Sequence, residues 1–309
     1  NVNGLAITTT ATSNIGLGST AVDSITTGDY NVGVGANALT ATTTGDENVA
    51  IGFRALLTNT TGSDNCAYGS GALQLATTAD NNTAMGKDAA YANTTGANNT
   101  AIGKQALYDN TTGGQNAAFG YRALYENTTA SNNSAFGNQA MQNNTTGTSN
   151  VAIGYESLKA NTTGFKNTSV GSGSAIDNTT GDNVAAFGYN TLANNTTADD
   201  NTGLGSQAMF TNTTGAKNTA VGTGAMYNNT TASYNTAVGA ESLDANTTGE
   251  HTTALGFAAL GANTTGSNGT SVGSEALAAN TTGANNTAVG VAALKTNTTG
   301  AYNTAIGGK

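Results

Sequence analysis

Apolar and polar residues recur along this chain with a fixed period of seventeen positions. Counting each repeat from 0, starting at Asn14, position 3 is apolar in all 18 repeats that reach it. Position 8 is apolar as well, position 4 is always Gly, and positions 12 and 13 are Thr in all 17 complete repeats. No insertion or deletion breaks this register. Such a period is typical of stacked, near-identical units, so the sequence predicts a solenoid.

The residues within one repeat predict β-structure. Positions 0–3 carry β-branched and aromatic residues such as Val49, Ile51 and Phe119, which favour strands. Positions 11–13, usually Asn-Thr-Thr, also suit a strand, whereas positions 7–10 fit either a third strand or a single helical turn. No segment is long enough for an independent helix. The predicted fold is therefore all-β: a parallel β-solenoid (a β-helix or β-roll) of about 18 coils, one coil per repeat, spaced about 4.8 Å apart.

The unbroken register predicts one domain over residues 1–309, although a chain of this length would ordinarily suggest two. The complete repeats cover residues 14–302, with partial coils at 1–13 and 303–309. The two partial pieces supply complementary positions, so exposed strand edges of two intact molecules could stack head to tail in register. The residues predicted to meet in such an assembly are Gly4, Leu5, Ala6 and Ile7 at one end, and Asn303, Thr304, Ala305, Ile306 and Gly307 at the other.

Charged residues occupy only a few positions of the repeat. All 27 of them fall at positions 5, 6, 9, 10, 15 or 16. Burying a charge is costly, so these positions are the expected solvated corners. Position 2 is always Ala, Gly or Ser beside the apolar position 3, and position 7 is always Ala, Ser or Thr beside position 8.

Neighbouring residues on a strand point to opposite faces, so these pairs restrict both faces of the chain. In one interpretation, one face lines a narrow core and the other packs on another chain, where small residues allow a close approach. In the alternative, a local turn directs both residues inward, or small residues are tolerated on a flat face. The invariant Gly at position 4 predicts a positive φ or a lack of room for a Cβ atom.

Composition narrows the classes of function. The net charge is −9, the sequence pI is about 4.3 and the cations are scattered, so nucleic acid is not an expected partner. The sequence contains no apolar run of 18 residues, so it predicts no membrane-spanning segment. The single His251 and single Cys66 cannot form a zinc set or a Cys–His pair, and no phosphate loop or catalytic Ser motif is present. We therefore expect no enzyme activity and no cofactor, with His251 solvated and Cys66 a small buried thiol.

Asn-Thr-Thr at positions 11–13 has two interpretations. Each copy is formally an N-glycosylation acceptor, for example at Asn93, Asn110, Asn161 and Asn212. In the alternative, the stacked amides form a ladder from coil to coil, as in cross-β arrays. A second Asn column at position 0, in 15 of 18 repeats, favours the ladder because Asn-Thr-Ala is no acceptor.

Two further columns suggest binding. Regular Thr columns are found in ice-binding solenoids, although adjacent Thr residues would leave only one column facing outward. Tyr91, Tyr108 and Tyr125 share position 9 and should stack, as should Phe210 and Tyr227. An exposed aromatic ladder can hold sugar rings, but stacking alone also explains it.

The phrase Asn-Thr-Ala-Ile-Gly, followed by Ala-Leu and Asn-Thr-Thr-Gly, resembles repeats of bacterial and phage tail-fibre-like proteins. Ala-Ile-Gly is similar to the head repeats of trimeric autotransporter adhesins, which form a parallel β-roll. The resemblance covers the whole chain, for example Asn99–Gly103 and Asn150–Gly154. Autotransporter heads use shorter repeats, and trimerisation is implied by this resemblance alone.

The function expected from these observations is that of a structural extracellular fibre protein that assembles with copies of itself, head to tail, laterally or both. The alternative is the shaft or receptor-binding region of a trimeric phage tail fibre or bacterial adhesin, and ice binding is a third hypothesis. The expected location is extracellular, at the cell surface or in a virion fibre. The expected partners are further copies of the chain, as a polymer or a homotrimer, with surface glycans as a second class.

Overall fold

A computed structural model describes the backbone of residues 5–6 and the whole of residues 13–308. The chain divides into two compact units, Asn1–Asn150 and Val151–Lys309. Each unit is a parallel β-solenoid with one coil per repeat, and the described residues contain no helix. The predicted fold class is therefore confirmed, and the grouping of residues 1–309 into one domain stays a prediction.

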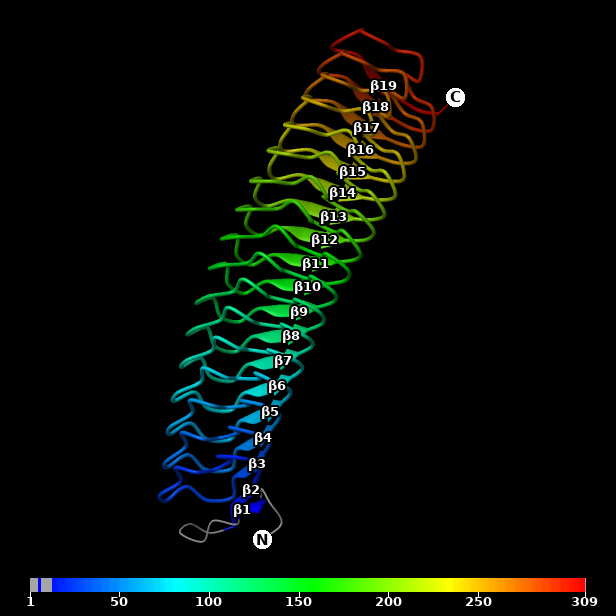
Figure 1. Cartoon of the computed structure of the whole chain (residues 1–309). Helices are drawn as coiled ribbons and strands as arrows, with labels where there is room; N and C mark the ends of the chain where they lie inside the picture. The colour runs from blue at the N-terminus through cyan, green and yellow to red at the C-terminus, as the bar shows by residue number, and fades with distance from the viewer. Residues whose placement is uncertain (1–4, 7–12, 309) are drawn as a thin grey trace. The chain divides into compact units, whose positions relative to one another are not determined.

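In the first unit, eight three-residue strands pair in parallel, each in register with the equivalent strand of the next repeat, as Ala67 with Ala84. A two-residue strand precedes them and pairs antiparallel with the first of the eight. The strands (Figure 1) are β1 (Leu5–Ala6), β2 (Ile15–Leu17), β3 (Val32–Val34), β4 (Val49–Ile51), β5 (Cys66–Tyr68), β6 (Thr83–Met85), β7 (Thr100–Ile102), β8 (Ala117–Phe119) and β9 (Ser134–Phe136).

The second unit repeats the same arrangement with ten parallel strands. They are β10 (Val151–Ile153), β11 (Thr168–Val170), β12 (Ala185–Phe187), β13 (Thr202–Leu204), β14 (Thr219–Val221), β15 (Thr236–Val238), β16 (Thr253–Leu255), β17 (Thr270–Val272), β18 (Thr287–Val289) and β19 (Thr304–Ile306).

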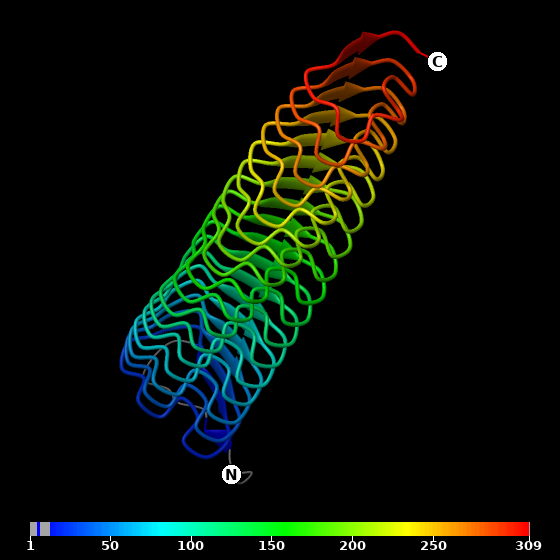
Figure 2. The same ribbon diagram turned by 90° about the horizontal axis from the view of Figure 1, so that it is seen from above.

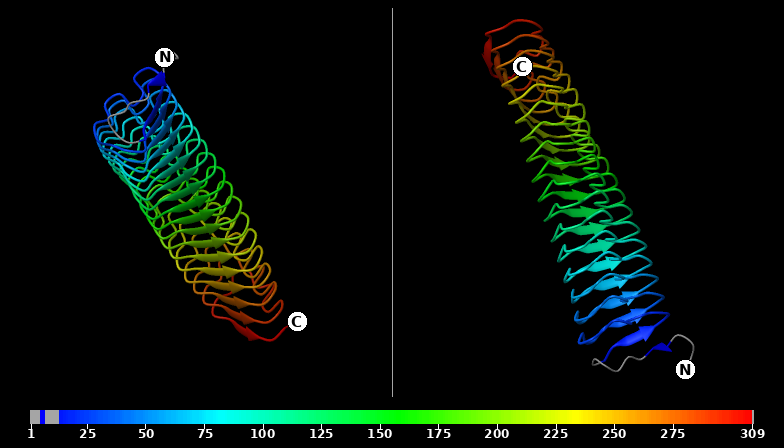
Figure 3. Two further views of the ribbon diagram at one scale, coloured as in Figure 1. Left: turned by 90° about the horizontal axis from the view of Figure 1, so that it is seen from below. Right: turned by 60° about the vertical axis from the view of Figure 1, so that its left-hand side comes forward.

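Within each unit the strands lie on one side of the coils, and turns and bends form the rest (Figure 2 and Figure 3). The expectation that positions 11–13 form a strand is wrong. The amides of both Thr43 and Thr44 donate to the carbonyl of Thr60, which bends the chain where a strand would alternate its bonds. Positions 7–10 form neither a strand nor a helical turn, because position 8 takes a positive φ, for example +53° at Leu107.

The core of each coil is narrow and is filled by small residues together with one large one. The Ala, Gly or Ser at position 2 is buried, as is Ala101, whereas the apolar residue at position 3 points outward, as does Ile102. The larger side chains at position 8, such as Leu107, fill the interior instead. The interpretation that the small residues face another chain is therefore wrong for the strands. The alternative of a turn that directs both residues inward holds for positions 7 and 8, where Ala106 and Leu107 are both buried.

Glycine at position 4 meets both conditions predicted from its invariance. Gly103 has a φ of +133°, and a Cβ atom there would lie 2.5 Å from the carbonyl oxygen of Gly120 in the next coil. Position 14 comes as close to the next coil, because a Cβ atom at Gly96 would lie 2.3 Å from the carbonyl oxygen of Gly113, but its φ is ordinary, and Ala79 and Ala130 occupy it in two coils of the first unit. At position 4 the close contact is combined with a φ that disfavours any residue other than Gly.

Position 6 offers a direct test of backbone strain in the second unit. Ala258 holds a φ of +50° there, and Gly224 occupies the same position with a φ of +65° and open space where a Cβ would be. A left-handed φ costs an L-residue about 1 kcal/mol relative to Gly. We expect Ala258→Gly to raise, and Gly224→Ala to lower, the free energy of unfolding by about 1 kcal/mol each, measured by urea denaturation. If both substitutions raised the free energy of unfolding, or both lowered it, this account would be contradicted.

Candidate functional site

In each unit, the outward-facing residues at positions 1 and 3 of the three-residue strands form a surface that we call the strand face of that unit. Position 3 is apolar in each of these strands, and no charged residue lies at either position. Side chains stack along it: the rings of Phe119 and Phe136 are 4.6 Å apart and nearly parallel. Large exposed apolar side chains on this face are Ile15, Leu17, Tyr68, Met85, Phe136, Ile153, Phe187, Leu204, Leu255 and Ile306. Exposed apolar patches of this kind commonly mark interaction sites.

Two corners border the strand face in each coil, because positions 15–16 precede the strand and positions 5–6 follow it. In the first unit these borders carry opposite charge. The border before the strands, which we call the acidic edge, contains Asp29, Asp46, Glu47, Asp64 and Asp80. The border after the strands, the basic edge, contains Arg54, Lys87, Lys104 and Arg122, with Asp88 as its one acidic residue.

The second unit lacks this polarity. Both of its borders are acidic on balance within the described residues. The border before its strands contains Asp182, Asp199, Asp200 and Glu250 against Lys166 and Lys217, and the border after them contains Glu156, Glu241 and Glu275.

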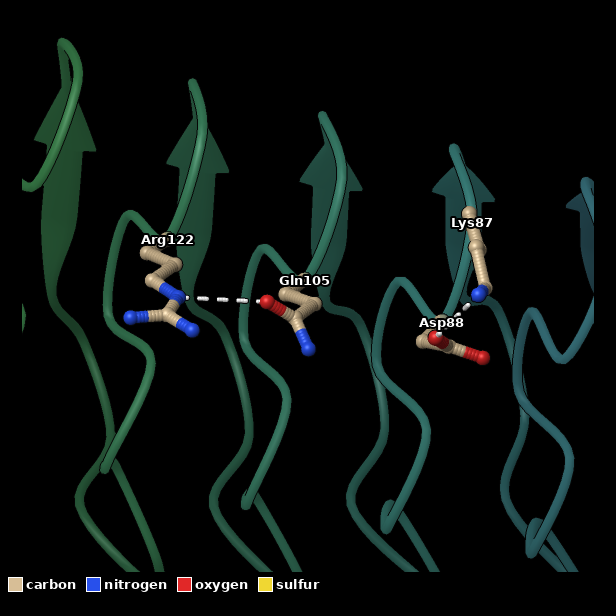
Figure 4. A network of polar contacts seen from close by, with 4 residues as sticks. All are labelled: Lys87, Asp88, Gln105 and Arg122. Atoms are coloured by element: carbon tan, nitrogen blue, oxygen red, sulfur yellow. Dashed lines mark hydrogen bonds and ion pairs between the residues drawn. The ribbon is translucent and has the colours of Figure 1, made fainter.

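Side chains from successive coils meet on the basic edge (Figure 4). The Nε of Arg122 donates to the Oε1 of Gln105 at 3.1 Å, and Lys87 lies 3.9 Å from the carboxylate of Asp88. The guanidinium of Arg122 also lies 5.2 Å from the ring centre of Tyr121, and the ammonium of Lys104 lies 5.9 Å from it. Such cation–π contacts orient the cations without neutralising them.

The basic edge was missed at the level of sequence, where the cations were read as scattered. The signal was present in the spacing of the cations. Lys87 and Lys104 are one full repeat apart, and Arg122 follows Lys104 by one repeat and one further residue. One coil per repeat places the three cations on neighbouring coils.

The predicted tyrosine ladder is confirmed, but its rings cover one another. Successive ring centroids of Tyr91, Tyr108 and Tyr125 are 5.1 Å apart, with planes within 9° of parallel. Phe210 and Tyr227 stack in the same way. Burial first, and then the neighbouring phenols of Tyr91 and Tyr125, raise the pKa of Tyr108 above its ordinary value. A sugar ring cannot stack on faces that are already occupied, so the geometry favours a stabilising role.

The asparagine columns form the hydrogen-bonded ladder that was one of their two interpretations. At position 11, the Nδ2 of Asn110 donates to the Oδ1 of Asn93 at 2.7 Å and to the carbonyl oxygen of Gly113 at 2.9 Å. Asn212 makes the equivalent pair of bonds. All four named acceptors, Asn161 included, are buried. Both amide hydrogens of Asn110 are therefore in use in the folded chain, and glycosylation stays a prediction.

The side chains of the asparagines at position 0 form hydrogen bonds with the backbone. The Oδ1 of Asn99 accepts the amide of Asn116 in the next coil at 3.0 Å, and its Nδ2 donates to the carbonyl oxygen of Gly113 at 2.9 Å. One side chain thus satisfies polar groups of two segments that would otherwise be buried without partners.

The two threonine columns differ in exposure. At position 12, Thr94 is half-buried and its Oγ1 donates to the carbonyl oxygen of Thr111 at 2.9 Å. Its neighbour Thr95, at position 13, is exposed. Each coil therefore presents one outward column from this pair, as expected, and ice binding stays a prediction.

The residues predicted for head-to-tail assembly lie at the two ends. Gly4 and Ile7 are outside the described residues. Leu5 and Ala6 form β1, whose antiparallel pairing with β2 differs from the partial coil expected for residues 4–13. This pairing satisfies the edge of β2 within the chain, as exposed strand edges require. At the other end, Thr304, Ala305 and Ile306 form β19, with Asn303 before it and Gly307 after it. Head-to-tail stacking stays a prediction, and it would require β1 to leave β2.

The outcomes for the single cysteine and the single histidine, Cys66 and His251, differ. Cys66 is half-buried at position 1 of β5, on the strand face, so the expectation of a buried thiol is wrong. It faces outward because alternate strand residues do, and only position 2 points into the core. His251 is exposed as expected, and its ring stacks 4.9 Å from that of Tyr234. In the described part of the chain, no three His, Cys, Asp or Glu side chains lie close enough together to hold a metal ion.

Comparison with protein-family models gives no match, and comparison with curated proteins gives no significant match. Among the described residues, no helix has the length and apolar character needed to cross a membrane.

Proposed function

We propose that this chain is a structural protein of an extracellular fibre and that it acts by self-association. The observation that carries the proposal is the strand face, where an apolar residue recurs in every coil and charge never occurs. A face that only had to remain in water would tolerate Lys or Glu at these outward positions. The restriction is therefore explained by burial against another surface.

The interior of each coil supports a mechanical role. Backbone hydrogen bonds join each coil to the next, as from the amide of Thr100 to the carbonyl of Asn116 at 2.8 Å, and the Asn ladders add side-chain bonds at the same spacing. Such repeated ladders give cross-β assemblies their resistance to unfolding. A chain built from them is suited to providing length and rigidity.

We expect purified protein to form oligomers or long filaments, and Ile102→Glu to shift it to monomers. Ile102 is half-exposed on the strand face, so a Glu there would fold but would bury a charge on association. Light scattering after size-exclusion chromatography and negative-stain electron microscopy would measure this. Ser24→Glu, at an exposed position 10 away from the strand face, is the matched control and should leave assembly unchanged. Wild-type protein that remains monomeric at all concentrations would contradict the proposal.

A second candidate function is the shaft or receptor-binding region of a tail fibre or adhesin. The basic edge supports it, because Lys104, Arg122 and Tyr121 form a focus that interrupts the repeat on an otherwise acidic chain. Electron microscopy separates the two candidates. Filaments much longer than one molecule favour the polymer, and discrete rods, single or trimeric, favour the shaft.

A further inference from the structure

We infer that the strand faces of the first units of two copies pack against each other with their solenoid axes parallel, so that the acidic edge of one copy meets the basic edge of the other. This inference rests on the proposed self-association and adds the surface and the orientation of the partner. The occupant of the face is a second copy of this chain.

The strand face and its two edges together suit a protein partner. A three-residue strand covers about 10 Å along its length and about 4.8 Å across. The eight strands of this length in the first unit therefore present roughly 380 Å². A standard protein–protein interface buries about 800 Å² per partner, so the acidic and basic edges beside the strands must take part in the contact as well. The face is uncharged, with an apolar residue at position 3 of each strand and an apolar residue, Thr or Ser at position 1, and charges lie only at its borders. A charge-depleted centre with a polar rim is the usual anatomy of an interface.

The charges of the first unit select the orientation. The strands run from the acidic edge to the basic edge in every coil. Turning a second copy by half a rotation about a line parallel to the solenoid axis brings its face opposite the first and exchanges the two edges, so unlike charges meet. Turning it about the strand direction reverses the axis and leaves like charges together. Since like charges across an interface cost several kcal/mol, the parallel arrangement is favoured.

When the two copies are in register, oppositely charged residues of the two edges lie at the same coil. Glu47 precedes β4 and Arg54 follows it, while Asp80 precedes β6 and Lys87 follows it. In the parallel arrangement, Arg54 of one copy therefore faces Glu47 of the other at the same coil, and Lys87 faces Asp80. Arg54 and Glu47 form no salt bridge within the described chain, although Arg54 lies over the ring of Phe53. Their charges are thus available to a neighbour.

Cross-linking tests the orientation. In a Cys66→Ser background, Ser134→Cys places one thiol at position 1 of β9, near one end of the first unit's strand face, and Val32→Cys places one near the other end. With a short bifunctional maleimide, we expect covalent dimers of full-length Ser134→Cys chains. Cross-links between Val32→Cys and Ser134→Cys chains would indicate an antiparallel arrangement and overturn the inference. Oligomers that form neither product would also overturn it.

Charge reversal tests the edges. Arg54→Glu with Lys87→Glu should weaken association about tenfold or more, and further reversal by Glu47→Lys with Asp80→Lys should restore it. Four changes of exposed threonines at position 13, outside the face and its edges, make the same change in net charge and should have little effect: Thr44→Glu, Thr78→Glu, Thr112→Glu and Thr146→Glu. If both sets of changes act equally, net charge explains the effect and the edge pairing is overturned. If no variant and no wild-type sample associates, the proposed function fails as well.

Discussion

Gly103→Ala is expected to lower the free energy of unfolding of the first unit by more than about 4 kcal/mol, a loss that only a few mechanisms produce. The new methyl group would lie 2.5 Å from the carbonyl oxygen of Gly120, and the φ of +133° lies outside the range that Ala adopts readily. Neither problem can relax alone, because the clashing atom belongs to the backbone of the next coil. Urea denaturation followed by circular dichroism would measure the loss.

Gly96→Ala is the matched control for this change. It adds the same methyl group at position 14, where a Cβ atom would lie 2.3 Å from the carbonyl oxygen of Gly113 but the φ is ordinary. We expect a smaller loss, because Ala79 and Ala130 show that adjacent coils can adjust to Ala at this position, whereas a φ of +133° disfavours Ala whatever the spacing. Amide hydrogen exchange would locate the damage, and Gly103→Ala should expose β7 and β8 first. A Gly103→Ala protein as stable as the Gly96→Ala protein would show that the φ at position 4 does not require Gly.

Asn110→Asp is expected to destabilise the first unit by about 4 kcal/mol at neutral pH, as removal of one partner from a buried network does. The change preserves shape but replaces two donated hydrogen bonds, to Asn93 Oδ1 and to the Gly113 carbonyl, with contacts between acceptors. It also places a carboxylate at a site with no exposure. Thermal and urea unfolding across a pH series would measure it.

The pH dependence identifies the cause. Burial and neighbouring acceptors would raise the pKa of this carboxyl above the unfolded value of about 3.9. Below that value both states are protonated, and the carboxyl regains one donor. The destabilisation should therefore be smallest at acid pH and grow as the pH rises through the unfolded pKa. Asn138→Asp, at an exposed corner, should show no such trend. An unchanged difference across the pH range would implicate packing rather than hydrogen bonding.

Much of the fold could be predicted because the repeat reports on geometry directly. Gly at position 4 indicated a close approach between coils, and Gly103 shows both that contact and a positive φ. The confinement of charge to six positions indicated the solvated corners, and no charged residue in the described chain is buried. These inferences rest on energies that do not depend on the detailed path of the chain.

The direction of neighbouring residues could not be predicted in the same way. Ala101 and Ile102 are both apolar, so the alternation of a strand left open which of them faced the core. The width of the coil decides it, and that width follows from left-handed turns at residues such as Leu107, which no propensity rule anticipates. Thr43 and Thr44 have strand propensity, but their amides share one acceptor and bend the chain. The strand face was thus hidden among residues expected in a core.

The two edges of the candidate site were visible in the sequence but were not connected. Glu47 and Arg54 are seven residues apart and read as scattered corner charges. Only with β4 between them and the strand face outward do they become opposite borders of one surface. Charge asymmetry across a strand, counted coil by coil, would have given this signal.

The Asn columns have a consequence for how such proteins change in evolution. Because Asn99 accepts from the backbone of the coil that follows it, and most coils offer the same groups to their neighbours, a whole coil can be duplicated or deleted with few changes to the contacts between coils. The length of the chain can then change by one coil at a time, through gain or loss of single repeats in the gene. Residues at the outward positions can change independently of the number of coils. The length of the chain and the chemistry of its surface can therefore evolve separately.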